Sequence, residues 1–179
     1  MKTRSKLIAI AIAVTLFFTA NVQAQTTPAG ALRMGIGLDA GIPTGNLTIS
    51  STFVLGGTIQ LQYGVSDRFA IALTSGADHF FSRNIPGTNK PYDSFGVIPI
   101  RAGIKEFFLP SIYFGAEAGI AYEQVDSGPG NKKLLIVPSL GYANKRWDIG
   151  LRYDNYSGQN DPYGFVAVRI AYGFAFFTK

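Results

Sequence analysis

The chain has 179 residues, of which 47% are hydrophobic, 13% aromatic and only 15% charged, and it contains one His and no Cys. The charged fraction lies well below the roughly 25% of an ordinary soluble domain, and the absence of Cys excludes a disulfide scaffold, a cysteine-based zinc site and a cysteine nucleophile. A lone His also excludes a His-rich metal site, so we expect no metal and no cofactor. The length is that of one domain.

The first 24 residues have the three parts of a secretory signal peptide. A basic start is followed by the apolar run LIAIAIAVTLFFTA at residues 7–20 and by the small-residue site Val22-Gln23-Ala24. The run is too short for a comfortable membrane-spanning helix. We therefore expect a signal peptide at 1–24, a short segment at 25–30 and one domain at 31–177.

The net charge of +5 overstates the basicity of the exported protein. Lys2, Arg4 and Lys6 account for three of the 16 basic residues, so 13 Lys and Arg remain against 11 Asp and Glu, a net charge of +2. No run rich in Lys or Arg follows. We expect no nucleic-acid partner.

After residue 30 the sequence alternates between apolar residues and polar or small ones with a period of two. In ALRMGIGLDAGI at 31–42, the even positions are all apolar, whereas the odd positions hold Ala, Arg, Gly and Asp. Successive side chains of a strand point to opposite faces. The pattern predicts eight strands, at 31–42, 53–65, 68–79, 95–105, 111–123, 134–143, 146–156 and 163–176.

Two architectures produce this alternation: a soluble barrel or sandwich with its apolar face inside, and a membrane barrel with its apolar face toward lipid. The polar face is mostly Gly, Ala, Ser and Thr, which suits the narrow interior of eight strands. The connections alternate between long and short, as in outer-membrane barrels. These features favour an all-β, eight-stranded, antiparallel up-and-down transmembrane β-barrel. A soluble periplasmic barrel is the alternative.

Aromatic residues gather near the strand ends, as they do in the interfacial girdles of membrane barrels. Phe95 and Phe107 share this position near strand ends. The predicted girdle consists of Phe53, Tyr63, Phe69, Tyr122, Tyr142, Trp147, Tyr153, Tyr172, Phe174 and Phe176.

The charges of the polar face should meet inside the barrel, where they are tolerated only when they are paired. Two interpretations stay open: a salt-bridge plug that fills the lumen, and a polar path for small solutes. Arg101 and Glu117, on neighbouring strands, are the expected central pair. The predicted lumen network is Arg33, Asp39, Arg101, Lys105, Glu117, Glu123, Asp148, Arg152, Asp154 and Arg169, and the alternation also turns Arg68 and Asp78 inward.

Three further residues test this scheme. Pro99 and Pro138 fall within predicted strands although proline cannot donate to a ladder, so we expect a bulge or a frayed stretch at each. His79 is the only imidazole that could serve as a base. Ser75 lies on the same strand face but about 13 Å away, and Ser82 follows in the predicted loop.

The segments SFGVIPIRAGIKEFF (94–108), IYFGAEAGIAYE (112–123), IVPSLGY (136–142) and VAVRIAYGF (166–174) resemble the small eight-stranded outer-membrane β-barrel family of the OmpA/OmpX type. The resemblance implies a monomer in the outer membrane of a Gram-negative bacterium, surrounded by lipids and lipopolysaccharide and inserted by the barrel-assembly machinery. The peptidoglycan-binding domain of some relatives is not expected.

The resemblance implies a structural or cell-surface interaction role without catalysis. A narrow, porin-like channel for small solutes and a lipid A-modifying enzyme are the alternatives. The loop sequences do not identify a surface partner.

Overall fold

The computed structural model describes residues 27–124, 130–158 and 161–177, and almost all of them lie in β-strands. Nothing in this part of the chain forms a helix long and apolar enough to cross a membrane. The predicted signal peptide lies outside the described residues. The elements are β1 (Leu32–Thr44), α2 (Leu47–Ser50), β2 (Ser51–Gly64), β3 (Phe69–Ser82), β4 (Phe95–Phe107), β5 (Ile112–Gln124), β6 (Lys132–Ala143), β7 (Trp147–Ser157) and β8 (Tyr163–Phe177).

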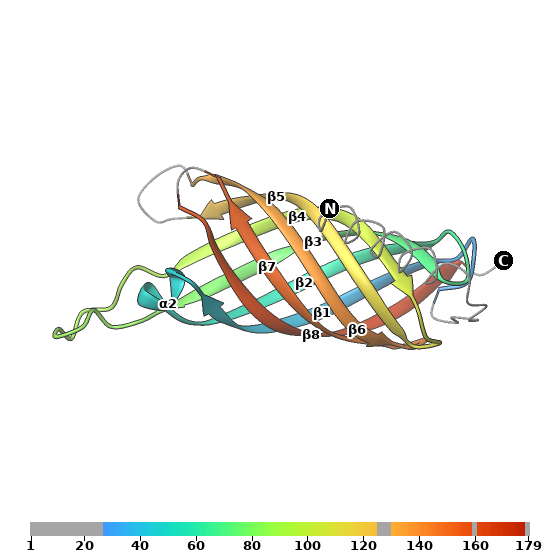
Figure 1. The fold of residues 1–179 in the computed structure, drawn as a ribbon, viewed down its shortest axis with the longest axis horizontal. Coiled ribbons are helices and arrows are strands. Elements are labelled where there is room, and N and C mark those ends of the chain that lie inside the picture. Colours follow the sequence, from blue (N-terminus) through green and yellow to red (C-terminus); the bar gives the residue numbers. More distant parts are fainter. Residues whose placement is uncertain (1–26, 125–129, 159–160, 178–179) are drawn as a thin grey trace, which may run out of the picture.

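The eight strands close into one barrel (Figure 1). Each strand pairs antiparallel with its neighbour in the sequence, and β1 pairs with β8 through thirteen consecutive residues of β1. Closure leaves none of these strands with an open edge, which is the condition for a sheet in lipid. The prediction of an eight-stranded up-and-down barrel is confirmed, with strand ends within three residues of those expected.

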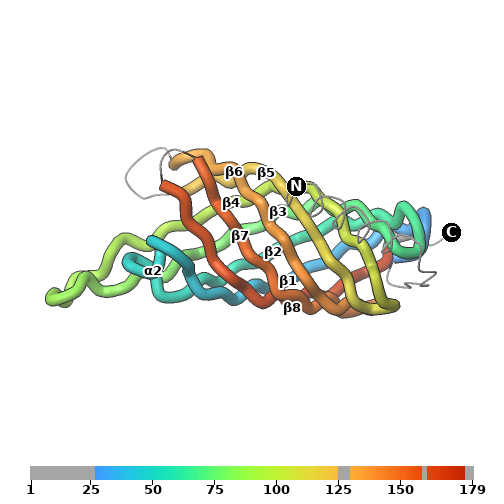
Figure 2. The backbone as a smooth tube through the Cα atoms, in the orientation of Figure 1, coloured from blue at the N-terminus to red at the C-terminus, as the bar shows by residue number. Residues whose placement is uncertain are grey.

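The two ends of the barrel differ (Figures 1 and 2). We call the end that carries the start of β1, the end of β8 and the tight turns at 65–68, 108–111 and 144–146 the turn rim. The opposite end, with α2 and the longer connections, is the loop rim. Residues 83–94 continue β3 and β4 past the loop rim as a hairpin, held by hydrogen bonds from Ile85 N to Lys90 O and from Tyr92 N to Arg83 O, both 2.9 Å.

Apolar side chains cover the outside of the barrel. On β1 the outward Leu38 is 67% exposed, whereas its inward neighbour Asp39 is 1% exposed. The same inside-out distribution continues around the wall, with Ile59, Leu73, Ile136 and Leu151 exposed and Arg101 buried. A contiguous apolar surface of this kind is not stable against water, and it matches the lipid-facing band of a membrane barrel.

Both prolines interrupt pairing on one side only. The β3–β4 ladder lacks the pairs at Ile98 and Pro99, and the β6–β7 ladder lacks those at Val137 and Pro138, yet the register continues unchanged across each gap. On the other side Pro99 pairs with Ala121 and Pro138 pairs with Ala116. The missing N–H therefore produces a local break in the ladder and no bulge.

Candidate functional site: the barrel lumen

The lumen holds a balanced set of charges. Five cations and five carboxylates lie between the turn rim and a cluster of aromatic side chains near the loop rim. Lys133 and Glu123 lie on the other side of that cluster, toward the loop rim. Counted over the described residues, the lumen charge network is Arg33, Arg101, Lys105, Lys133, Arg152 and Arg169 with Asp39, Asp78, Glu117, Glu123, Asp148 and Asp154.

Two positions differ from the sequence interpretation. Arg68 lies in the turn before β3 and pairs at 3.3 Å with Glu106 at the turn rim, so it does not belong to the lumen network. The prediction that Arg68 points into the lumen is wrong, because the strand starts one residue later than expected, at Phe69. Lys133 was not anticipated, because β6 begins two residues earlier than expected, at Lys132, which turns Lys133 inward.

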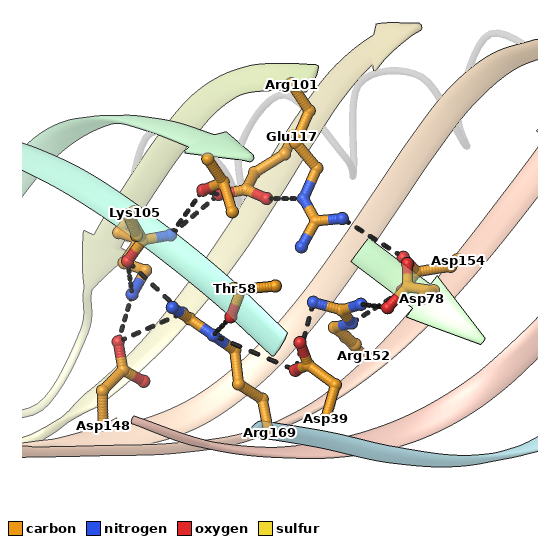
Figure 3. Close-up of polar contacts among 12 residues, drawn as sticks. Asp39, Thr58, Asp78, Arg101, Lys105, Glu117, Asp148, Arg152, Asp154 and Arg169 are labelled. Carbon is orange, nitrogen blue, oxygen red and sulfur yellow. Dashed lines mark hydrogen bonds and ion pairs between the residues drawn. The ribbon is translucent and has the colours of Figure 1, made fainter. Parts of the chain in front are cut away.

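Arg101 joins two carboxylates of the network (Figure 3). Its Nε donates to Glu117 Oε2 at 2.5 Å, and its Nη1 lies 3.4 Å from Asp154 Oδ2. The other oxygen of Glu117 accepts from Thr74 Oγ1 at 2.8 Å and Gln60 Nε2 at 3.0 Å. Strands β2, β3, β4, β5 and β7 are thereby joined across the barrel axis.

Toward the loop rim, carboxylates surround Arg152. Its guanidinium lies 2.8 Å from Asp154, 3.2 Å from Asp39 and 3.8 Å from Asp78. Arg169 reaches the same group at 3.9 Å through Asp39. This half of the network has more carboxylates than cations, and the guanidinium of Arg152 is shared among three of them.

Toward the turn rim, cations outnumber carboxylates. Asp148 pairs with Lys105 and accepts from Tyr113 Oη at 2.7 Å. Arg169 Nη1 lies 3.9 Å from Asp148, and its Nε donates to Thr58 at 3.2 Å. Arg33 is 5% exposed, and no ion pair joins it to any described residue.

An aromatic plug closes the lumen near the loop rim. We define it as Phe80, Phe95, Tyr156, Tyr163 and Phe165. Phe80 is fully buried, stacks on Phe95 at 4.5 Å between ring centroids, and meets the other three rings edge-on at 5.5–6.4 Å. Leu47 of α2 is buried in the same cluster.

The plug corrects the sequence interpretation of two residues. Phe95 belongs to the plug, and Phe107 is buried beside Tyr113 at the turn rim, so neither lies in an outer girdle. Both share the strand face of Arg101 and Lys105, which points inward. Phe80, Tyr156 and Phe165 likewise share the inward face with the charged residues of their own strands. This alternation is the feature of the sequence that could have predicted the plug.

Small cavities lie between the side chains of the lumen. Two cavities of about 10 and 20 Å³ lie among the charged side chains, and a cavity must offer roughly 10–15 Å³ to hold a single water. A larger hollow of about 240 Å³ opens at the loop rim, where Lys133 Nζ donates to Asp161 O at 2.8 Å and Tyr163 Oη donates to Glu123 at 2.7 Å. The plug separates this hollow from the charges below.

The predicted girdle residues whose side chains the structure describes lie on the outer face. At the turn rim the ring of Tyr172 packs edge-on against Trp147 at 5.2 Å and against Phe174 at 5.0 Å, and at the loop rim Phe53 lies 6.2 Å from Phe81. Tyr63, Tyr142 and Tyr153 are exposed, Phe69 and Tyr122 are half-buried, and the side chain of Phe176 lies outside the description.

His79 does not meet a serine. It lies exposed on the outer face of β3 and packs edge-on against Phe81 at 4.7 Å. Ser75 donates its hydroxyl to the carbonyl of Pro99 at 3.0 Å, and no hydrogen bond joins His79 to Ser75 or Ser82. Within the described ranges no three His, Cys, Asp or Glu side chains are placed to hold a metal ion.

Comparison with known proteins identifies the fold. No protein-family model matches the sequence, and no curated protein is significantly similar to it. Among solved structures, the outer membrane protein Ail of Yersinia pestis in a nanodisc matches with a TM-score of 0.59 and 12% identity over 81% of this chain and 99% of that one. The N-terminal β-barrel domain of Pseudomonas aeruginosa OprF matches with a TM-score of 0.50 and 14% identity over 79% and 97%.

Neisserial surface protein A matches with a TM-score of 0.50 and 18% identity over 82% of this chain and 98% of that one. The fold is thus that of the small eight-stranded outer-membrane β-barrels, which confirms the resemblance at the level of architecture. The likeness covers 79–82% of this chain, and the identities of 12–18% are too low to carry a role.

Proposed function

We propose that this protein spans the outer membrane as a closed, non-conducting barrel that presents the loop rim to the cell exterior. The observation that carries the proposal is the occupied lumen: an aromatic plug and a network of paired charges lie across it, and the two cavities among those charges measure only about 10 and 20 Å³. An eight-stranded barrel has an interior just wide enough for side chains to fill. The function of the protein then depends on the outer surface of the barrel and on its loops.

Conductance in planar bilayers tests this proposal. The purified barrel should give no steady single-channel steps, whereas regular steps from the wild-type protein would favour the narrow channel for small solutes. A variant with Phe80, Tyr156 and Phe165 all changed to Ala should also stay closed, because the ion pairs of Arg101 and Arg152 lie below the plug.

The membrane location rests on the apolar outer face and has its own test. In cell fractionation the protein should follow the outer membrane, and its gel mobility should shift on boiling. Soluble protein in the periplasmic fraction would support the alternative of a soluble barrel. The wall then contacts lipids and lipopolysaccharide, and insertion by the barrel-assembly machinery forms part of the same proposal.

A surface-interaction role is supported by the hairpin of residues 83–94, which projects past the loop rim and carries Arg83, Lys90 and Tyr92 (Figure 2). Similarity to Ail, whose name is attachment invasion locus protein, adds the same suggestion for this chain. Replacing residues 84–91 with a two-residue turn should keep the heat-modifiable barrel and abolish attachment of expressing cells to a surface or to lipopolysaccharide. Unchanged attachment would contradict a surface-interaction role for the hairpin and would favour a structural role for the protein.

We also propose that the barrel has no catalytic activity on lipid A. The isolation of His79 from Ser75 and Ser82 supports this, because a base must lie within about 3 Å of the proton it removes. Mass spectra of lipid A from expressing and deleted strains should be identical. A new acylated or deacylated species that depends on His79 would overturn it.

A further inference from the structure

The turn-rim half of the lumen contains donors without acceptors. Arg33 is 5% exposed, and its Nε and Nη2 have neither a hydrogen bond nor an ion pair. The Nη2 of Arg169 is also buried without a hydrogen-bond partner. Buried guanidinium donors are costly unless they are satisfied, and native structures rarely leave them so.

These donors border one cavity. Arg33 and Arg169 line the same space of about 10 Å³, together with Gln60, Gln62, Asp148 and the small residues Gly35, Ala171 and Gly173. The guanidinium of Arg33 lies over Gly173, where a methyl group would collide with it. The cavity has room for one particle of about the size of a water molecule.

The electrostatics of the cavity favour a negative occupant. Asp148 is the only carboxylate in its lining, and both of its oxygens already accept, one from Tyr113 and one from Lys105. Arg33 and Arg169 thus line the cavity with a single carboxylate, and each oxygen of that carboxylate already accepts a hydrogen bond from a residue outside the lining. The two arginines also offer more N–H groups than the two lone pairs of a water molecule can accept.

We propose that this cavity binds a single small monovalent anion of the chloride class, held between Arg33 and Arg169. A spherical anion accepts several N–H donors at once. Chloride is somewhat larger than a water molecule, so the side chains of Arg33 and Arg169 move apart to seat it, whereas phosphate, sulfate and carboxylate ions would displace the lining much further. Arg33 is the second residue of β1, so the ion enters from the turn rim. The inference concerns the lower lumen and is independent of whether the loops bind a partner.

Bromide, as the heavier analogue of chloride, provides the direct test. Crystals of the folded wild-type barrel grown in bromide should give an anomalous peak between Arg33 and Arg169. In solution, the thermal unfolding midpoint should be higher in chloride than in gluconate at equal ionic strength, by about 2–4 °C. Arg33→Gln should lose both effects, and Arg83→Gln, in the projecting hairpin, should keep both.

Gly35→Ala is a second variant that retains both arginines. The added methyl group would lie no closer than 3.7 Å to its neighbours, so the barrel should fold, yet the methyl group enters the lining of the cavity. It should reduce the bromide peak and the chloride shift. Ordered water without anomalous signal, bromide only at other positions as an adventitious ion, or a chloride shift that survives in Arg33→Gln would each overturn the proposal.

Discussion

Arg101 and Glu117 form an ion pair on the diagonal between β4 and β5, and each faces a glycine directly across the ladder. Arg101 is opposite Gly119, and Glu117 is opposite Gly103. A methyl group on either glycine would collide with the backbone and side chain of the charged residue opposite. The two glycines therefore leave the space that the side chains of Arg101 and Glu117 need in order to meet in the lumen.

Glu117→Ala should strongly destabilise the barrel. The change removes the closest acceptor of Arg101 and leaves Thr74 and Gln60 without their shared partner. Removing one partner of a buried ion pair costs about 3–5 kcal/mol. Urea titration of reversible folding into lipid vesicles measures the free energy of unfolding.

Glu106→Ala is the matched control. Glu106 pairs with Arg68 at the turn rim, where its side chain is 20% exposed, and pairs near the surface contribute about 0–1 kcal/mol. Equal losses for the two variants would mean that the central pair contributes no more than a rim pair.

Gly119→Ala should destabilise the barrel by about 1–3 kcal/mol, because the methyl group has to displace Arg101 or the β4 backbone. Gly57→Ala provides the comparison, since a methyl group there meets nothing within 4 Å and points outward. That change should be neutral or stabilise by up to about 1 kcal/mol. The same urea titration distinguishes them, and a harmless Gly119→Ala would show that the pair does not need its glycine.

The fold was predictable because period two is a local property of the sequence. It assigns every strand an inner and an outer face, so Arg101 and Glu117 could be placed inside from their parity alone. Contacts such as that of Arg152 with Asp39 could not be placed, because β7 and β1 are separated by β8. Their meeting depends on the tilt and stagger of the closed barrel, which the alternation does not specify.

The aromatic plug was missed for a different reason. In the sequence, position near a strand end favours an outer girdle, and the predicted third strand ends at 79, which leaves Phe80 in a loop. The strand continues to Ser82, and Phe80 keeps the inward parity of Thr74 and Asp78. Parity therefore outweighs distance from the strand end when an aromatic residue is assigned to one face.

Neighbouring phenylalanines allow the plug to be tested at a single depth. Phe80 is fully buried among four rings, whereas Phe81 faces outward and is 41% exposed. Phe80→Ala should cost about 3–5 kcal/mol of folding free energy because it leaves a cavity among the rings. Phe81→Ala should cost less than half as much in the same vesicles, and the reverse order would place Phe81, not Phe80, in the packed interior.

An outward arginine measures the depth of the wall in lipid. Ile59 lies near the middle of β2, and Tyr63 lies on the same face one residue from its turn-rim end. An arginine on the lipid face of a membrane barrel costs about 2–4 kcal/mol at the bilayer midplane and about 0–1 near the interface. Ile59→Arg should therefore destabilise the barrel in vesicles, lowering its free energy of unfolding by about 2–4 kcal/mol, and Tyr63→Arg should change that free energy little. In detergent micelles, which tolerate a charge more easily, the difference should shrink. Equal and small effects in vesicles would mean that acyl chains do not cover this face, because water would then solvate both guanidinium groups alike.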